Sequence, residues 1–572
     1  IYTLPGKSWM WTAFVEAITF ILPLDREFWQ EEPWGRKMIK IGQLKLAVEE
    51  GQDSLLPAIA KCLKLKKEEI SAYQILRRSL DARKKPQLFY VYTVSVELRG
   101  VSEKKLLAKL KNKDIQSYIP VLYQEPKCPE RIQGKALADF FQWEEHRPVV
   151  VGFGPAGIFA SLLLARAGCR PIVYERGKAV EERAKDVEAL WEKGILNKES
   201  NPQFGEGGAG TFSDGKLNTL VKDQNGRSRF VLQEFIRHGA KEEILYDAKP
   251  HVGTDALISI VSSIRKEIES LGGEINFGQQ YRFQKEEKNP LIIAIGHSAR
   301  DSFQELYDLS YPLLAKDFAM GFRVQHSQKD IDTALYGEVS EELREKLGAS
   351  AYKISHQAKH RSFYSFCMCP GGYVVNSSSE EGRLCVNGMS YSKRDSGYAN
   401  SAIIFTVKKE EYGGENNPLA GIALQEYWEE KAFHLGEGRV PYSRYDKIKN
   451  VANEIEDLEL MLKGQSKECD LNPLFRFENY PKLGNIKEDF IESMEAFEGK
   501  MKGFAKGNTL VYGVESRTSS PLRILRDENF RCMEKDIYPC GEGAGYAGGI
   551  MSAAMDGMKV AEAYIRSLQN RG

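Results

Sequence analysis

A glycine-rich loop with the spacing of a dinucleotide-binding turn follows a short apolar run; its sequence is Gly-Phe-Gly-Pro-Ala-Gly, residues 152–157. Gly152 permits a tight turn out of a strand, and Gly154 lets the backbone approach a pyrophosphate with no side chain between them. Gly157 lets the following helix pack closely on the strand. Glycine therefore stands at each position where a phosphate-binding turn needs it.

The residues around this turn complete an arrangement of strand, loop, helix, strand and acid. Pro155 and Ala156 begin an apolar helical repeat, whose N-terminus would present unpaired N–H groups to phosphates. Glu175 ends the next apolar run, 23 positions after Gly152, where an acid that binds a ribose hydroxyl is expected. Arg176 follows it and is included in the predicted site. A turn that serves only close packing is the alternative, but the complete arrangement favours dinucleotide binding.

A second glycine-rich segment, residues 203–217, could lie against a flat ring because backbone amides without side chains can approach it closely. It lacks the Gly-Lys-Ser/Thr ending of a Walker loop, and a plain surface turn is the alternative. The positions predicted to contact a cofactor are Gly207, Gly208, Ala209 and Gly210. The predicted catalytic residues are Thr211, Ser213 and Lys216. Of these, Lys216 would place a positive charge where a reduced flavin carries negative charge.

A third loop near the C-terminus precedes a helix rich in small residues, expected over residues 551–563. A helix N-terminus stabilises negative charge, as a reduced flavin ring would require. The predicted binding residues of this loop are Gly541, Glu542, Gly548, Gly549 and Ile550. A flexible glycine loop is the alternative.

These motifs need a scaffold, and the hydrophobic pattern predicts one of several parts. A small α+β domain is expected over residues 38–123, with strands at 39–46, 70–77 and 87–98 and helices at 55–63 and 103–110. A polar, proline-bearing linker follows at 124–146. Residues 1–37 form a leader of uncertain order. Residues 377–381 and 411–417 are expected to be surface loops.

The composition favours a small-molecule enzyme in a reducing cytoplasm. Lys and Arg together number 80, as do Asp and Glu, so no overall charge favours nucleic acid or an anionic membrane. Nine cysteines without paired CxxC motifs indicate neither a disulfide scaffold nor structural zinc, and no metal is predicted. The apolar run at 11–23 is too short to span a membrane and contains Glu16. A cleaved signal is the less favoured interpretation of it. The oligomeric state is left open.

Several long motifs together resemble a bacterial and plastid family of FAD-dependent dehydrogenases, related to NAD(P)/FAD-dependent oxidoreductases, whose FAD domain is similar to that of glutathione-reductase-like flavoproteins. The resemblance covers nearly everything from Met38 to the C-terminus. It is carried by residues 149–157, 203–217, 294–301, 364–372, 513–521 and 541–549.

This resemblance implies an α/β fold with a Rossmann-like FAD-binding domain of the glutathione-reductase type, an inserted α+β substrate domain and the small N-terminal α+β domain. The FAD-binding domain is expected at 147–312 and 505–572, and the substrate or cap domain at 313–504. Gly296 would lie where the chain passes the middle of FAD. The implied function is that of an FAD-dependent oxidoreductase with an unidentified small-molecule substrate. Because one dinucleotide loop is present, any NAD(P)H would bind transiently.

Lesser candidates have simpler interpretations. Cys367 and Cys369 could exchange electrons as a dithiol, although a structural role is favoured because buried cysteine commonly acts as a small hydrophobe. His251 and His297 could donate protons, but histidines held by the backbone are commoner. The basic stretch at 77–85 could recruit RNA or a protein partner, with turnover secondary. We favour a solvated hairpin or a contact with the enzyme body, and nucleic-acid binding is not expected.

Overall fold

The computed structural model describes residues 38–129, 139–451, 455–533 and 535–568. The predicted leader and part of the predicted linker lie outside these residues. None of the helices in the described part of the chain is both long enough and apolar enough to cross a membrane. The fold mixes helices with parallel and antiparallel sheets, as predicted at that level of detail.

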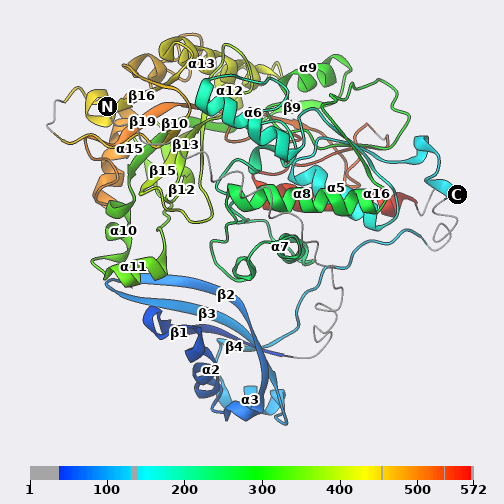
Figure 1. Ribbon diagram of the computed structural model, residues 1–572, viewed down its shortest axis with the longest axis vertical. Helices are drawn as coiled ribbons and strands as arrows, with labels where there is room; N and C mark the ends of the chain where they lie inside the picture. Colours follow the sequence, from blue (N-terminus) through cyan, green and yellow to red (C-terminus); the bar gives the residue numbers. More distant parts are fainter. Residues whose placement is uncertain (1–37, 130–138, 452–454, 534, 569–572) are drawn as a thin grey trace, which may run out of the picture.

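The N-terminal part is a four-stranded antiparallel sheet in the order β2-β3-β1-β4, packed against two helices (Figure 1). Its elements are β1 (Met38–Ala47), α2 (Leu55–Leu63), β2 (Ile70–Lys84), β3 (Gln87–Leu98), α3 (Glu103–Leu110) and β4 (Ile115–Tyr118). Ile59 and Leu63 of α2 bury their side chains with Ile41 and Val94 of the sheet. The far end of the β2–β3 hairpin packs against Tyr336, so this part contacts the body of the protein.

A five-stranded sheet in the order β21-β8-β5-β6-β7, parallel throughout, forms the second part. Its strands are β5 (Val149–Val151), β6 (Ile172–Glu175), β7 (Glu274–Phe277), β8 (Leu291–Ile293) and β21 (Ile537–Pro539). The three valines of β5 are buried, as expected for a strand covered on both faces. The carboxyl ends of β5, β6 and β8 lead into the predicted cofactor segments.

Helices pack around this sheet, with α5, α8 and α16 close together (Figure 1). They are α5 (Pro155–Arg166), α6 (Val180–Lys193), α7 (Arg227–Arg237), α8 (Thr254–Ser270), α9 (Arg300–Asp308) and α16 (Ile550–Ser567). A Cβ atom at Gly557 would lie 2.1 Å from the carbonyl oxygen of Ala156, so α16 can cross α5 at this distance only with glycine there. The first turn of α5 is thereby fixed against α16.

The third part is built on a seven-stranded sheet, β11-β12-β15-β10-β19-β16-β18, with a three-stranded sheet, β14-β13-β17, beside it. The strands are β10 (Phe318–Ser327), β11 (Ser355–Gln357), β12 (Ser362–Cys369), β13 (Tyr373–Asn376), β14 (Val386–Met389), β15 (Tyr398–Val407), β16 (Val440–Arg444), β17 (Leu462–Lys463), β18 (Ser466–Glu468) and β19 (Leu510–Glu515). Its helices are α10 (Gln328–Tyr336), α11 (Glu341–Leu347), α12 (Lys409–Tyr412), α13 (Ala420–Gly436), α14 (Tyr445–Ile448) and α15 (Lys487–Lys500). A two-stranded sheet of β9 (Leu313–Ala315) and β20 (Leu522–Ile524) completes the fold.

Three local features differ from the sequence-based expectations. β19 pairs with β10 and β16 in the seven-stranded sheet, although its residues fall in the predicted second stretch of the FAD-binding domain. Ser377, Ser378 and Ser379 are buried rather than exposed, because they share hydrogen bonds with other buried groups. The predicted loop at 411–417 begins inside α12. The exact domain boundaries remain a prediction.

Candidate functional site

One cavity brings together segments from the parallel sheet, the seven-stranded sheet and the three-stranded sheet beside it. On one side it is lined by residues that follow β5, β6 and β8, and by the start of α16. On the other side it is lined by Phe366 and Cys367 of β12, Asn387 of β14 and Glu515 of β19. The carboxyl edge of a parallel sheet is the usual place for a ligand in α/β proteins.

Most of the predicted site residues line this cavity. They are Gly152, Gly154, Pro155, Ala156, Glu175, Arg176, Gly208, Ala209, Gly210, Ser213, Lys216, Gly296, Glu542, Gly548, Gly549 and Ile550. Four others do not line it: Gly157, Gly207, Thr211 and Gly541. A Cβ atom at Gly157 would lie 1.9 Å from the carbonyl oxygen of Gly152, so its role is the close packing foreseen for it. Thr211 is buried beneath the loop, beside Gly207.

The glycines of the cavity leave room that side chains would fill. A Cβ atom at Gly296, Gly548 or Gly549 would meet no protein atom within 4 Å. Gly152 has φ +98°, and a Cβ atom there would lie 2.6 Å from the carbonyl oxygen of Ala294. The turn after β5 thus requires glycine, while the other three glycines face open space.

Two helices begin at the cavity without a side-chain cap. The N-cap of α5 is Gly154 and that of α16 is Gly549, and neither helix start has a side-chain cap hydrogen bond. Amides in the first turn of a helix have no intrahelical partner, and they carry partial positive charge. Both ends therefore suit the phosphates or the reduced ring of a flavin nucleotide.

Glu175 organises the turn as well as facing the cavity. Its Oε2 atom accepts a hydrogen bond from the Phe153 amide at 2.8 Å. Its Oε1 atom accepts from the amides of Gly177 at 2.9 Å and Gly205 at 3.0 Å. A carboxylate has about four acceptor positions, so one is left for a ribose hydroxyl.

Arg176 is held at the cavity by protein partners. Its guanidinium pairs with Glu199 and Asp301, each at 2.8 Å, and lies 4.3 Å from the ring centre of Phe204. The two carboxylates balance the positive charge of Arg176. Arg176 lines the cavity, and its contact with a cofactor remains a prediction.

The glycine-rich segment at residues 203–217 is held in place by a fully buried arginine. The Arg183 guanidinium donates hydrogen bonds to the carbonyl oxygens of Gly205, Glu206 and Gly208 at 3.2, 2.7 and 2.9 Å. Because these carbonyls are tied to one rigid group, the amide edge of the loop has a fixed shape toward the cavity. This support was not recognised in the sequence.

Lys216 has a buried counter-ion. Its Nζ atom lies 3.0 Å from Asp214, which also accepts a hydrogen bond from Arg394 at 2.6 Å. Burial alone would lower the pKa of Lys216, but the charge of Asp214 raises it above its ordinary value. The lysine is therefore charged at the cavity wall, with that charge partly balanced by Asp214.

Two further titratable groups face the cavity near α16. Burial raises the pKa of Glu542 to about 7. Burial, followed by the charges of Arg517 and Arg300, lowers the pKa of His297 to about 3, so this imidazole is neutral. Its Nδ1 atom is buried and has no hydrogen-bond partner among the described residues, while Nε2 lies 3.8 Å from Glu542. An unpaired ring nitrogen at the cavity wall suits a polar ligand.

Arg517 and Thr518 also line the cavity, and the sequence analysis gave them no role. Arg517 is fixed by Glu429 and Glu380 at 2.7 and 2.9 Å. The only signal in the sequence was the motif at 513–521, which contributed to the family resemblance without indicating a contact.

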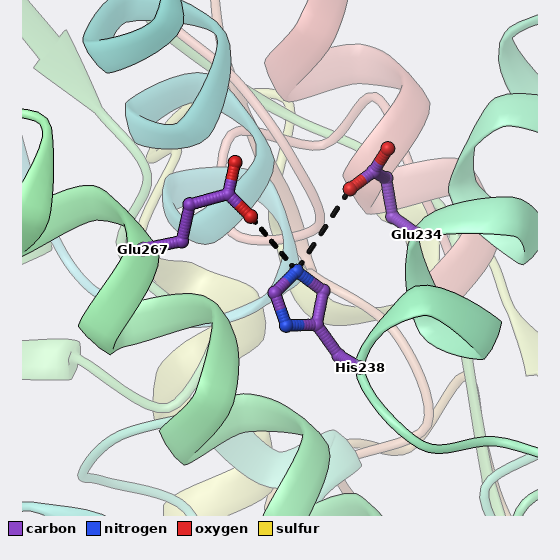
Figure 2. A group of neighbouring side chains, drawn as sticks. All are labelled: Glu234, His238 and Glu267. Carbon is purple, nitrogen blue, oxygen red and sulfur yellow. Dashed lines mark ion pairs between the residues drawn. The ribbon is translucent and has the colours of Figure 1, made fainter. Parts of the chain in front are cut away.

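A separate cluster, Glu234, His238 and Glu267, is the one group in the described part of the chain whose ligand atoms are close enough to share a metal ion (Figure 2). The His238 Nε2 atom lies 3.1 Å from Glu267 and 3.9 Å from Glu234. Arg166 donates to both carboxylates, at 2.6 Å to Glu234 and 2.8 Å to Glu267. Because a cation already balances these carboxylates, we interpret the cluster as an ion-pair network that joins α5, α7 and α8.

This network predicts a pH-dependent contribution to stability. Burial raises the pKa of Glu267, but hydrogen bonds from His238 and Arg166 lower it to about 2, against 4.5 in an unfolded chain. The stabilisation is thus complete above about pH 4.5 and is lost as the pH falls toward 2. Glu267→Gln should destabilise α7 and α8 by about 2 kcal/mol at pH 7.

The measurement is amide hydrogen exchange in α7 and α8, corrected for the intrinsic rate at each pH. The exposed neighbour Glu269→Gln is the control. The difference between wild type and Glu267→Gln should be largest at pH 7 and clearly smaller at pH 3, where Glu267 is protonated in the unfolded chain but still mostly ionised in the folded one. An equal difference at both pH values would show that the charge of Glu267 does not contribute.

Comparisons with known proteins support FAD as the cofactor of this protein. Residues 317–518 match the family described as "FAD-dependent protein, C-terminal domain-like", and residues 38–97 match a domain of unknown function. The glycine cradle and the two uncapped helix N-termini fit such a cofactor. The protein is therefore a flavoprotein with FAD as its cofactor.

A protein of Clostridium beijerinckii is 42% identical over 548 residues, which cover 92% of this chain and 98% of that protein. The chain belongs to the same family as this clostridial protein. Two solved structures are more distantly similar. The tetracycline destructase Tet(51) is 10% identical over 74% of this chain and 82% of its own, with a TM-score of 0.28. CtdE, in complex with FAD and substrate 4, is 10% identical over 75% and 88%, with a TM-score of 0.25. Likenesses this weak carry no conclusion.

Proposed function

We propose that the chain is an FAD-dependent oxidoreductase that exchanges a hydride with a small-molecule substrate in the cavity between the two sheets. One observation carries this proposal. The three glycine-rich segments, at residues 152–157, 203–217 and 541–549, share a cavity with charged and polar side chains of the seven-stranded sheet. When bound, FAD supplies the two-electron chemistry, taking up or giving out a hydride at flavin N5. The residues of the chain would bind FAD and the substrate, orient them toward each other and balance the charge on the flavin.

The pyrophosphate would be held at the first turn of α5, with Gly154 in contact and Glu175 at the ribose. The N-terminus of α16, with Gly549, would lie at the pyrimidine side of the ring or at the ribityl chain. Glu542 faces the same region, and with its pKa raised to about 7 it can hold a proton near neutral pH. A protonated Glu542 could donate a hydrogen bond where an ionised one could only accept.

Ser213 and Lys216 are the proposed contacts to substrate or to the ring edge. The Ser213 hydroxyl donates to the Gly210 carbonyl at 2.6 Å and accepts from the Gly215 amide at 3.2 Å, which leaves one lone pair for a ligand. Thr211 is not part of the proposal, because it lies beneath the loop. NAD(P)H, if used, would bind transiently, since the described parallel sheet already supports the FAD loop.

The experiment is anaerobic reduction of the purified FAD-loaded protein by NADH, NADPH and a panel of small metabolites, followed at the flavin absorbance band. At least one donor should bleach the flavin within a single-turnover experiment. A fully loaded protein that no donor reduces, and that no organic acceptor reoxidises after chemical reduction, would contradict hydride exchange.

The charge of Lys216 predicts a change in flavin potential. Lys216→Met keeps most of the aliphatic stem and leaves Asp214 with one cation fewer, so the anionic reduced flavin loses stabilisation. The midpoint potential should fall by roughly 30 mV, or about 1.4 kcal/mol for two electrons. FAD affinity should change less.

Spectroelectrochemical titration measures this potential, with the exposed Lys222→Met as the control. An unchanged potential in fully loaded Lys216→Met would place the lysine away from the ring and remove it from the proposed site.

The alternative in which a basic N-terminal element recruits RNA has no support in the structure. Arg78 contacts the body of the protein, where its guanidinium pairs with Asp247 at 2.7 Å, and Arg83 pairs with Asp81 at 2.8 Å. The charges of the hairpin are thus partly balanced within the molecule. The sequence favours either a solvated hairpin or a contact with the enzyme body for this stretch, and Arg78 makes such a contact.

A further inference from the structure

β12 carries an irregularity where it reaches the cavity. Phe366 pairs with Ala402 and Cys369 with Asn400, so one extra residue is inserted in β12 between them. Cys367 lies in this bulge with φ +43°, a left-handed conformation that is unusual for a residue other than glycine. As a result Cys367 lines the cavity and is partly exposed, while Cys369 is fully buried behind it.

A buried arginine holds the bulge in place. The Arg323 guanidinium donates to the Cys367 carbonyl oxygen at 3.2 and 3.3 Å and pairs with Glu515 at 2.7 Å. A Cβ atom at Gly388 would lie 2.3 Å from the Arg323 Nη1 atom, so glycine is required for this approach. The unfavourable backbone of Cys367 therefore persists because its surroundings determine it.

The two thiols lie beside each other and beside a cation. The Cys369 thiol donates to the Cys367 carbonyl oxygen at 3.3 Å, and the Lys216 Nζ atom lies 3.8 Å from the Cys369 Sγ atom. The neighbouring side chain of Cys369, aided by the charges of Lys216 and Arg323, outweighs the effect of burial and lowers the pKa of the Cys367 thiol to about 5. Burial raises the pKa of Cys369 above its ordinary value. One thiol is thus accessible and ionised, and the other is buried and protonated.

We propose that Cys367 and Cys369 form a redox-active dithiol that reduces a small disulfide entering the cavity, with Cys367 as the attacking thiolate and Cys369 as the resolving thiol. This activity goes beyond the proposed hydride exchange and does not require it. An accessible thiolate beside a protected second thiol is the arrangement that thiol–disulfide exchange needs.

The exchange balances without a further oxidant or reductant. The Cys367 thiolate attacks one sulfur of the disulfide, forms a mixed disulfide and releases the first thiolate. The Cys369 thiol loses its proton, attacks the Cys367 sulfur and releases the second thiolate. The protein has then lost two electrons and the substrate has gained them, while the proton from Cys369 is taken up by a released thiolate.

Proximity between thiols is not sufficient for this role. Cys128 and Cys169 have Sγ atoms 3.7 Å apart, but both are buried and neither lines the cavity. Their position in the hydrophobic core between α5 and the linker gives no path for a substrate. The Cys367 pair combines cavity access with a neighbouring cation, and this combination distinguishes it.

The test uses the full-length FAD-loaded protein, reduced, desalted and kept anaerobic, with oxidised glutathione as the probe. Free thiols are counted after denaturation, and peptides are mapped by mass. In wild type, we expect an internal disulfide between Cys367 and Cys369. Cys369→Ser should instead carry glutathione on Cys367, and Cys367→Ser should carry none at this pair. Cys469→Ser, which changes a partly exposed cysteine elsewhere, should behave as wild type.

Glutathione on Cys369 in Cys367→Ser at the wild-type rate, or no disulfide in wild type, would overturn the proposal. Flavin bleaching without glutathione, coupled to thiol loss, would make the flavin the acceptor and overturn the assignment of substrate class. Because serine could disturb the buried position, Cys369→Ala is measured in parallel. It should trap the same mixed disulfide.

Lys216 would act through the thiols as a positioning residue, and the pH profile distinguishes this from a structural effect. In Lys216→Met, the rate of Cys367 modification by oxidised glutathione should fall about fivefold at pH 5 and about twofold at pH 6, as expected if a pKa of about 5 is raised by about one unit. The rate should approach that of wild type as the pH rises to 9. A loss of rate that is equal at all pH values would reject this role.

Discussion

Gly154→Asp is expected to yield a folded protein that no longer retains FAD. The new carboxylate would enter the cavity where the first turn of α5 would meet the pyrophosphate. A Cβ atom at Gly154 would lie 3.6 Å from the Gly208 Cα atom, an ordinary van der Waals contact, so the substitution itself leaves the fold intact. Two charges about 4 Å apart repel by roughly 4 kcal/mol near a protein surface, which corresponds to about a thousandfold loss of affinity.

The measurement is the ratio of flavin to protein absorbance, followed by heat release of the cofactor and its identification by mass. Gly499→Asp on α15 is the control, because a Cβ atom there meets no protein atom within 4 Å and the residue lies outside the cavity. Circular dichroism checks that both variants fold. Full FAD occupancy in Gly154→Asp would reject the assignment of the turn to the pyrophosphate.

The elements that local patterns determine could be predicted from the sequence. α2, β3 and α3 begin and end at the expected residues, since the apolar repeat and the turn residues between these elements are all local. β2 extends seven residues past its predicted end at 77, because the hairpin continues along β3 to a contact with Tyr336. That contact joins residues far apart in the sequence, so the local pattern of apolar residues cannot predict it.

The strand order of the seven-stranded sheet could not be predicted from local patterns either. β10, β15 and β19 are neighbours although long stretches of chain separate them, and their pairing follows from packing that no local pattern encodes. β19 is not among the strands predicted from the sequence, and its place in the seven-stranded sheet depends on pairing with distant strands. The buried serines at 377–379 were misplaced for a related reason: their partners, Gln203 and Arg517, come from distant segments.

For the site, the glycine loops could be predicted because each has its own spacing and each adjoins a strand or helix. Their meeting in one cavity was an expectation of the family resemblance. The surroundings of Lys216 could not all be predicted. Asp214 is near it in the sequence, but Cys369 lies on β12, and Arg394, which pairs with Asp214, lies in a distant loop. β12 also supplies Cys367, whose bulge depends on Arg323 and so on a contact between three strands.

A large loss of stability is expected from the substitution Glu429→Gln, because Glu429 pairs with both Arg300 and Arg517. Its carboxylate is fully buried on α13 and accepts hydrogen bonds from Arg300 of α9 at 2.8 and 2.9 Å. It also accepts from Arg517 at 2.7 and 2.9 Å, and Arg517 lines the cavity. Burial would raise the pKa of Glu429, but the charges of Arg300 and Arg517 hold it well below its ordinary value. The network therefore carries a full negative charge between two buried cations at neutral pH.

Glu429→Gln keeps the size of the side chain and removes this charge, which leaves the two guanidinium groups to share Glu380 alone. Removal of one partner from a buried ion pair costs about 3–5 kcal/mol, because the remaining charge stays desolvated. Denaturant unfolding should show a loss of this size, and FAD should dissociate more readily because Arg517, which lines the cavity, loses one of its two carboxylate partners. Glu430→Gln, its exposed neighbour on the same helix, should differ from wild type by less than about 0.5 kcal/mol. If Glu429→Gln were as stable as Glu430→Gln and retained FAD equally well, the charge of Glu429 would not be what holds α9 and α13 together at the cavity.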